Sequence, residues 1–308
     1  MRRDCITLRI VVLWASLVSI CGCGQEAPTP PAETQPARAA PQVPAKAPLP
    51  APAPLPPRAP RTFKVVHVFV CLCDNANQGI VRVPDALGNG QDPKNNLYWG
   101  AMYGTKTFLS RSSHWRVVPA GGLTITHDET DAKAVLDRAV FESTDGPKTY
   151  ILAEAYDGAH MALALRRFIE ASAGTLERTV ATASGVGGIS IQAGGKADLV
   201  CFVGHNGLMD APLTIEPKPA AERPAGAVVL ACKSRDYFSA PLKAAKCPPL
   251  TLTTGFMAPE AYTLDAVIHA WAAGRSADAI HLRAAEAYAK YQRCRLSAAK
   301  RLFTKRAP

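Results

Sequence analysis

The sequence predicts an α/β protein with a mostly parallel, doubly wound sheet and flanking helices. Short apolar runs rich in β-branched residues, such as 199–203 and 227–230, are typical of strands buried on both faces. Stretches with helical spacing alternate with these runs, as expected when helices connect parallel strands. The folded part, 63–308, has the size of one ordinary domain.

Residues 63–73, dominated by Val and Phe, predict the first strand. A polar loop follows it, rich in Asn and Gly, which is where α/β proteins place ligand contacts. Further strands are expected at 115–118, 123–126, 149–155, 199–203, 227–230 and 250–254, and 134–141 is apolar but ambiguous.

A helix is expected to begin near Leu97, because Asn95 or Asn96 can cap it and the apolar residues Met102 and Phe108 follow. Ser276 is the expected cap of one long final helix whose apolar positions keep helical spacing as far as Leu302. The other helices are expected at 159–171, 236–246 and 259–273.

The first 22 residues have the pattern of a secretory leader, with Arg2 and Arg3 before an apolar run too short to span a bilayer. The junction Ile20-Cys21-Gly22-Cys23 resembles the bacterial lipobox, which implies that Cys23 becomes the acylated N-terminus. Gly24 after it implies the outer rather than the inner membrane. We therefore expect an exported protein that is lipid-anchored in the bacterial cell envelope; the alternative is a plain signal peptide cleaved nearby.

Residues 23–62 are expected to form a disordered linker. Half of the 26 prolines fall there, among alanines and few charges. Proline fixes φ and lacks an N–H, so the stretch favours extended conformers and cannot build a core.

The formal net charge of +10 is concentrated at the C-terminal end, where residues 275–308 contain nine basic and two acidic side chains. A solvated basic helix face is favoured over a surface for anionic lipid or a partner. No nucleic-acid motif accompanies it, so nucleic acid is not an expected partner. The chain has no CxxC, HExxH, GxGxxG, GxxxxGK[ST] or GxSxG pattern, so no metal or other cofactor is expected.

Two residues capable of chemistry follow the apolar runs. His205 comes after 199–203, between Gly204 and Asn206-Gly207, and Cys232 comes after 227–230. If the two strands are parallel neighbours, both residues emerge at the same edge of the sheet, about 5 Å apart in strand spacing. A thiol beside an imidazole is a nucleophile beside its base.

This arrangement resembles the clan of cysteine peptidases that includes caspases, legumain, clostripain and gingipains, in which one strand ends in His-Gly and a later one in Ala-Cys or Gln-Cys. The matching residues are His205 with Gly207, and Ala231-Cys232. The resemblance implies a caspase-like fold and an endopeptidase acting on a peptide or protein substrate. Cys232 would attack a carbonyl, His205 would transfer protons, and the Gly207 and Cys232 amides would stabilise the oxyanion.

In that clan the end of the first strand helps to shape the pocket for the side chain before the cut. Asp74 and Asp210 are the corresponding candidates here, and a carboxylate at the base of the pocket would favour Arg or Lys. Against this, Lys233 and Arg235 follow the cysteine directly and would neutralise Asp74 or favour an acidic substrate instead. The competing interpretation of Asp74 is that it only caps the turn that it opens.

A second function class remains open. Asn206 separates the His from the Gly, and the spacing from His205 to Cys232 is shorter than in caspases. These departures favour a non-catalytic envelope lipoprotein that keeps the fold as a binding or scaffolding domain.

Overall fold

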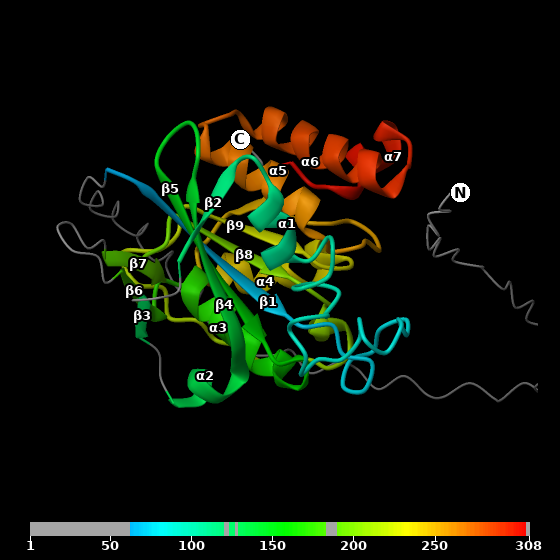
Figure 1. The fold of residues 1–308 in the computed structure, drawn as a ribbon, viewed down its shortest axis with the longest axis horizontal. Helices are drawn as coiled ribbons and strands as arrows, with labels where there is room; N and C mark the ends of the chain where they lie inside the picture. Colours follow the sequence, from blue (N-terminus) through cyan, green and yellow to red (C-terminus); the bar gives the residue numbers. More distant parts are fainter. Residues whose placement is uncertain (1–61, 120–122, 127–128, 183–189, 306–308) are drawn as a thin grey trace, which may run out of the picture. The chain divides into compact units, whose positions relative to one another are not determined.

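The computed structural model describes residues 62–119, 123–126, 129–182 and 190–305. The predicted leader, Cys23 and the linker up to residue 61 lie outside these residues. The described domain is an α/β structure, as the sequence predicts, with a mostly parallel sheet between layers of helices (Figure 1).

Seven strands form the large sheet in the order β10-β9-β8-β1-β5-β4-β2. The neighbours from β5 to β10 pair in parallel, whereas β4 is antiparallel to both β5 and β2. After β1 the chain passes to the edge strand β2, returns inward through β4 to β5 beside β1, and then continues outward on the other side through β8, β9 and β10. The topological switch point lies between β1 and β8. The strands are β1 (Lys64–Cys71), β2 (Trp115–Val118), β4 (Val135–Ser143), β5 (Thr149–Tyr156), β8 (Leu199–Val203), β9 (Gly226–Leu230) and β10 (Pro249–Thr251).

The alternation of side chains along β1 divides the core into two layers. Val66, Val68 and Val70 point into one layer, and Val65 and Phe69 into the other. The first layer lies under α1 (Thr105–Arg111), α5 (Ala261–Ala272), α6 (Ala277–Gln292) and α7 (Leu296–Leu302). The second lies under α3 (Met161–Ser172) and α4 (Ser234–Ala244). Because both faces are covered, the central strands consist of almost continuous apolar residues.

A smaller antiparallel sheet with the order β3-β6-β7 packs beside the second layer. Its strands are β3 (Leu123–Thr126), β6 (Glu177–Thr182) and β7 (Ser190–Gly194). The sequence predicts β3 but not β6 or β7, since both are short and rich in polar residues. The short elements α2 (Glu129–Ala134), η1 (Gly158–His160) and η2 (Gly207–Met209) complete the described elements.

The prediction that a helix begins near Leu97 is wrong. The segment before Thr105 consists of turns, and the helix α1 begins only at Thr105. Gly100 and Gly104 approach the backbone of this segment so closely that a Cβ atom would lie within 2.5 Å of it. Here close backbone contacts within residues 93–104 override helical spacing.

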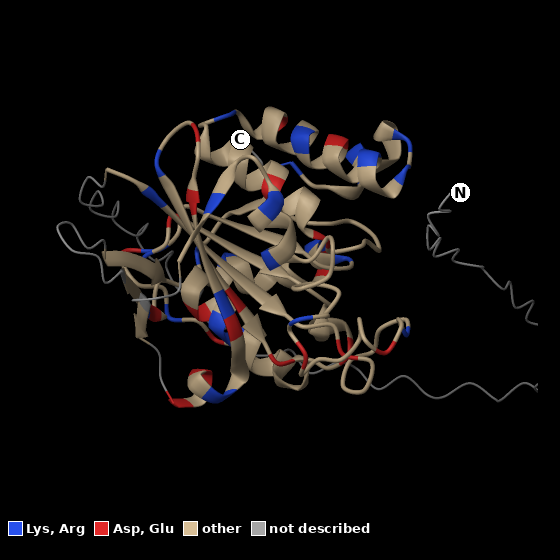
Figure 2. Ribbon diagram, viewed as in Figure 1, with Lys and Arg blue, Asp and Glu red and all other residues tan. Residues whose placement is uncertain are grey.

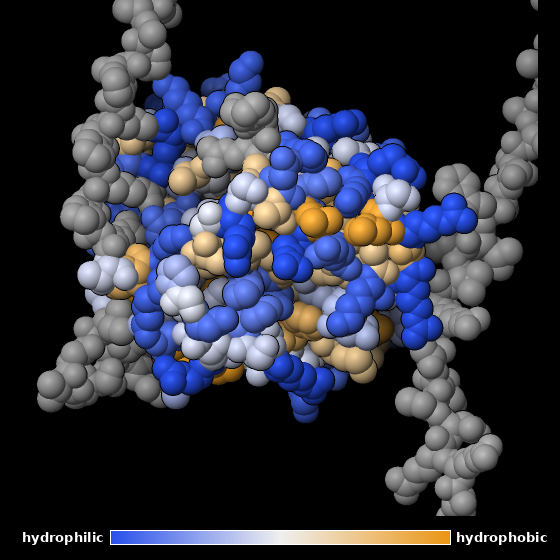
Figure 3. Space-filling view, turned by 90° about the horizontal axis from the view of Figure 1, so that it is seen from above, coloured by the Kyte–Doolittle hydropathy of each residue, from blue (hydrophilic) through white to orange (hydrophobic). Residues whose placement is uncertain are grey.

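The single long helix expected after Ser276 is also wrong. Ser276 does cap α6, accepting a hydrogen bond from the Ala279 amide, but Arg293 takes a left-handed conformation with φ 52° and ends the helix. The chain then restarts as α7. Lys and Arg side chains are spread along both helices, and this side of the surface is mostly hydrophilic (Figures 2 and 3). Among the described residues, none of the helices has both the length and the apolar character needed to cross a bilayer.

Candidate functional site

His205 and Cys232 lie at the carboxyl edge of the sheet, at equivalent positions of two neighbouring strands. The strands β8 and β9 are parallel, and their last paired residues are Val203 and Leu230. His205 and Cys232 each follow this pair by two residues. The sequence-based expectation that these two strands are parallel neighbours is therefore confirmed.

The backbone before His205 is sterically constrained. Gly204 has φ 150°, and a Cβ atom there would lie 2.9 Å from the carbonyl oxygen of Cys71. A side chain is disfavoured at this position both by the dihedral angle and by the neighbouring strand. Glycine thus allows the chain to leave β8 close to β1 and to direct His205 to the edge of the sheet.

The imidazole of His205 is largely buried and has a defined partner. Its Nε2 lies 2.8 Å from Oδ2 of Asp210, and the Gly79 amide donates to the same oxygen at 3.0 Å. An ionised carboxylate only accepts, so Nε2 carries the proton and Nδ1 is left as the basic nitrogen of a neutral ring. Asp210 therefore fixes the orientation and tautomer of His205, and joins it to the loop after β1.

The thiol of Cys232 is half-buried, and its hydrogen-bond partner is the backbone of Met257. The Met257 amide lies 3.4 Å from Sγ and the Met257 carbonyl oxygen lies 3.5 Å from it. Burial raises the pKa of Cys232; the Met257 amide and the charge of Lys233 oppose this without cancelling it. The thiol at rest is consequently protonated at neutral pH, and a reaction would require a base to remove its proton.

Lys233, the next residue, adopts a left-handed conformation with φ 49° and ψ 32° at the start of α4. Its amide donates to the carbonyl oxygen of Gly255 at 2.8 Å. Such a conformation costs free energy in a residue other than glycine, and it is often found where a side chain is held for function. The sharp turn places the half-buried Cys232 at the junction of strand and helix.

Asn206 joins the two strand ends, a role that the sequence did not reveal. Its side chain is buried; Nδ2 donates to the carbonyl oxygen of Cys232 at 2.7 Å, and Oδ1 accepts from the Leu208 amide at 3.2 Å. In the sequence this residue only separates His205 from Gly207. In the structure it holds the segment after β8 against the segment after β9. The only signal in the sequence for this role of Asn206 is its place as a polar residue just beyond a strand expected to be buried.

The two predicted oxyanion donors differ in availability. The Gly207 amide already donates to the carbonyl oxygen of His205 at 3.2 Å, and a Cβ atom on Gly207 would lie 2.3 Å from Met161. This amide faces the protein in the described conformation, so it is not free to bind an oxyanion there. The Cys232 amide makes no hydrogen bond within the described part of the chain, and it is therefore the available donor of the two.

The two predicted pocket carboxylates are also engaged. Asp74 is buried and accepts from the amides of Ala76 and Asn77, from the Asn77 side chain and from Gln91. Burial alone would raise the pKa of Asp74, but these hydrogen bonds outweigh it and lower the pKa. The contacts are those of a turn cap, and those of Asp210 orient His205, so a role in substrate recognition stays a prediction for both.

His205 and Cys232 share an edge but not a hydrogen bond. Across the described ranges no direct bond links the imidazole to the thiol, and each is held by its own partner. No group of three or more His, Cys, Asp or Glu in these ranges is arranged to hold a metal ion. The geometry thus offers a thiol, a basic nitrogen and an amide donor on adjacent segments.

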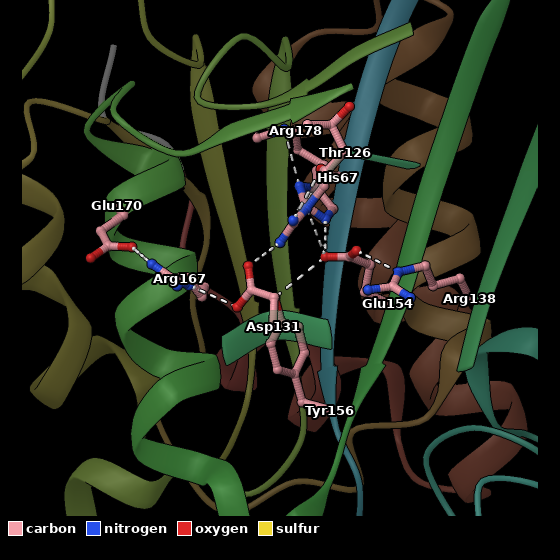
Figure 4. Close-up of polar contacts among 10 residues, drawn as sticks. His67, Thr126, Asp131, Arg138, Glu154, Tyr156, Arg167, Glu170 and Arg178 are labelled. Atoms are coloured by element: carbon pink, nitrogen blue, oxygen red, sulfur yellow. Dashed lines mark hydrogen bonds and ion pairs between the residues drawn. The ribbon is translucent and has the colours of Figure 1, made fainter. Parts of the chain in front are cut away.

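A buried ion network lies apart from this edge, between the large and small sheets (Figure 4). Glu154 on β5 is fully buried; its Oε1 accepts from Arg138 Nε at 2.9 Å and its Oε2 pairs with Arg178 Nε at 3.3 Å. Arg178 in turn donates to Asp131 at 2.6 Å, and Asp131 also accepts from Arg167 at 2.8 Å. Opposite charges therefore alternate through the network, which is what burial of ionised groups requires.

His67 on β1 completes the network as a neutral ring. The Gly194 amide donates to its Nδ1 at 3.1 Å, so the proton lies on Nε2, which donates to Glu154 at 3.1 Å. Burial lowers the pKa of His67, in agreement with a neutral ring. For Glu154, burial alone would raise the pKa, but the His67 hydrogen bond and the two arginines outweigh it and lower the pKa to about 2. The network ties β1 and β5 to β6 and β7.

Comparison with known proteins adds no assignment: no protein family, no curated protein and no solved structure matches this chain.

Proposed function

We propose that this protein is a cysteine hydrolase, most simply an endopeptidase of the caspase-like clan, with Cys232 as the nucleophile and His205 as the acid–base residue. The observation that supports it best is the register of β8 and β9, which gives both residues the same position beyond a shared residue pair. For the reaction, one of the strand-end segments would have to move so that the thiol and the imidazole meet. Catalytic pairs are often loose before substrate binds.

In this mechanism Nδ1 of His205 takes the proton of the Cys232 thiol while Sγ attacks the substrate carbonyl carbon. The Cys232 amide donates to the oxyanion that forms. Collapse of the tetrahedral intermediate breaks the C–N bond, and His205 returns the proton to the leaving amine. Water, deprotonated by His205, then hydrolyses the thioester and regenerates the thiol. Asp210 keeps the imidazole in the tautomer that these steps use.

The proposed hydrolase also has a proposed location, the cell envelope, and a proposed substrate, a peptide. The protein would be exported and held in the cell envelope by an acylated Cys23, which mass spectrometry of the mature N-terminus would detect as a lipid-modified cysteine. Acidic and basic residues both occur in the loops at the carboxyl edge (Figure 2). Asp74 and Asp210 would favour a peptide substrate that is basic before the cut, whereas Lys233 and Arg235 would favour an acidic one. Fluorogenic peptides ending in Arg, Lys, Asp or Asn measure this preference, and Cys232→Ala should abolish cleavage of all of them.

Alkylation of the thiol tests the proposal without knowledge of the substrate. The full chain is treated with iodoacetamide at pH 7.5, and mass spectrometry of proteolytic fragments compares Cys232 with the exposed Cys294 as an internal reference. A catalytic Cys232 should react faster than Cys294 despite its burial and raised pKa, because an imidazole that reaches the thiol in solution would take its proton; His205→Ala should then slow Cys232 alone. Slower reaction of Cys232 than of Cys294, unchanged by His205→Ala, would sink the proposal.

The second candidate is a non-catalytic binding or scaffolding domain. The observation that favours it is that the thiol and the imidazole are each bonded elsewhere, to Met257 and Asp210. In that case Cys232 and His205 hold the strand-end segments in place. Cys232→Ala would then lower stability and leave a partner-binding edge without any hydrolytic activity to lose.

A further inference from the structure

A cavity of about 320 Å³ lies next to the second half of α5 and is lined there by Ala266, Ala270 and Ala273. It belongs to the opposite edge of the sheet from His205 and Cys232: Lys64, which begins β1, donates to the Ala272 carbonyl oxygen at the end of α5, at 2.7 Å. This volume suits a small organic molecule. The cavity is independent of the proposed hydrolase function.

The polar lining of the cavity is of one kind. Its remaining residues are His114, His269, Arg275 and Arg283, and no carboxylate is among the lining residues. Guanidinium groups and protonated imidazoles only donate hydrogen bonds, whereas the alanines offer apolar contact. A ligand that satisfies both parts must have anionic oxygens and a compact apolar body.

His114 is oriented as a donor. Asp265 accepts from Trp115 Nε1 at 2.7 Å, and its Oδ1 lies 3.1 Å from Nδ1 of His114. Because this carboxylate accepts, Nδ1 of His114 carries a proton and Nε2 is the nitrogen left for a ligand. The hydrogen bond to Asp265 raises the pKa of His114, which favours the imidazolium, in which Nε2 also donates.

His269 is stacked on His114, with ring centroids 3.8 Å apart and an interplanar angle of 4°. Its Nε2 lies 3.5 Å from Oδ2 of Asp145, in the turn between β4 and β5. Each of the two imidazoles is thus paired with a carboxylate that is not part of the cavity lining. The stack fixes both rings in one orientation at the cavity wall.

The arginines differ in how far they are already paired. Arg283 donates to Glu286 at 3.0 Å. The guanidinium of Arg275 has no hydrogen bond or ion pair with any described residue. Its backbone amide donates a hydrogen bond to the Ala270 carbonyl oxygen at 3.0 Å, which fixes the backbone. A guanidinium matches the spacing of carboxylate and phosphate oxygens and binds them in bidentate fashion. Arg275 is therefore the most available cation of the cavity.

We propose that this cavity binds a small organic anion, a carboxylate or phosphate monoester with a compact apolar group, through Arg275 and His114. The anionic oxygens accept from the guanidinium fork of Arg275 and from Nε2 of His114. The apolar group packs against the alanines of α5.

The test is an NMR titration of the full chain with benzoate, phenyl phosphate and the neutral benzamide, following the imidazole signals of His114 and His269. At least one of the two anions should bind more tightly than benzamide, which has the shape of benzoate but no charge. Arg275→Gln should weaken binding about tenfold, because one charge-assisted bidentate contact is lost. Arg295→Gln, which removes an exposed arginine outside the cavity lining, should leave binding unchanged.

A second variant separates the cavity from its charge. Ala273 is exposed at the end of α5, so Ala273→Leu fills the cavity without disturbing the core and keeps every charged group. It should abolish anion binding. Binding that survives Ala273→Leu, equal effects of Arg275→Gln and Arg295→Gln, or benzamide binding as tightly as both anions would each overturn the proposal.

Discussion

Replacing Glu154 by Gln should destabilise the domain strongly although the two side chains have the same shape. The amide nitrogen of Gln cannot accept, so it would face either Arg138 Nε or the Nε2 proton of His67, both of which are donors. His67 cannot change tautomer without losing the bond from the Gly194 amide. Arg178 would also lose one of its two buried counter-charges and keep only Asp131.

Glu154→Gln should lower the free energy of unfolding by about 3 kcal/mol on two independent grounds. Removing one partner of a buried ion pair typically costs about 3–5 kcal/mol. The pKa of Glu154 is lowered from 4.5 to about 2, and at about 1.4 kcal/mol for each pKa unit the ionised form gains about 3 kcal/mol on folding. With a urea m-value of about 2 kcal/mol/M, a loss of about 3 kcal/mol lowers the unfolding midpoint by about 1.5 M.

The stabilisation contributed by ionised Glu154 depends on pH. A lowered folded-state pKa contributes stability that is present above the unfolded value of 4.5 and is lost as the pH falls toward 2. The difference in unfolding free energy between wild type and Glu154→Gln should therefore be full at pH 7 and shrink below about pH 4.5. Circular dichroism in urea at several pH values measures it.

The matched control for Glu154→Gln is Asp85→Asn. Asp85 pairs with Arg82 on the surface, where the two side chains are 82% and 75% exposed. Exposed pairs contribute at most about 1 kcal/mol, so this change should barely move the midpoint. Equal midpoints for Glu154→Gln and Asp85→Asn, or a difference from wild type that persists unchanged at low pH, would refute the account of the network.

Two further substitutions test the strained backbone at Gly204 and the His114–Asp265 pair beside the cavity at α5. Gly204→Ala should cost about 1–3 kcal/mol of unfolding free energy, since φ 150° is strained for alanine and its Cβ would meet Cys71. The control Gly226→Ala, where the nearest atom to a Cβ would be 3.5 Å away, should cost much less. Equal losses for the two variants would contradict this. His114→Gln should lower thermal stability by at most about 1 kcal/mol, because the pair is partly exposed. Asp265 raises the pKa of His114, and Asp145 adds to the effect, so the stability that the pair contributes is present below about pH 6.5 and is lost at higher pH. A loss of equal size at pH 5.5 and pH 9 on His114→Gln would exclude this contribution.

The sequence alone sufficed for the features that depend on contacts within a segment. The runs 199–203 and 227–230 are buried strands because their own residues are apolar on both faces. The order of such runs then predicted an α/β sheet, and with it the shared edge of His205 and Cys232. The cap at Ser276 and the start of α6 are local as well.

Other features were decided by backbone contacts that the spacing of apolar residues does not predict, some within a segment and some between segments. Spacing that predicted a helix from Leu97 failed because the segment packs too tightly for one, and the final helix ended at Arg293, where the local pattern continued. The strands β6 and β7 escaped prediction because their polar residues are stabilised by each other and by the ion network.

The candidate site divides in the same way. Its position followed from sequence, since each strand end is locally encoded. Its chemistry did not: the pairing of His205 with Asp210, the bond from Asn206 to Cys232 and the partners of Glu154 each depend on where a second segment lies. The sequence determined which side chains stand at the edge of the sheet. Only the tertiary structure decided their tautomers, charges and partners, because a hydrogen bond or ion pair is fixed by distance in space and not by spacing along the chain.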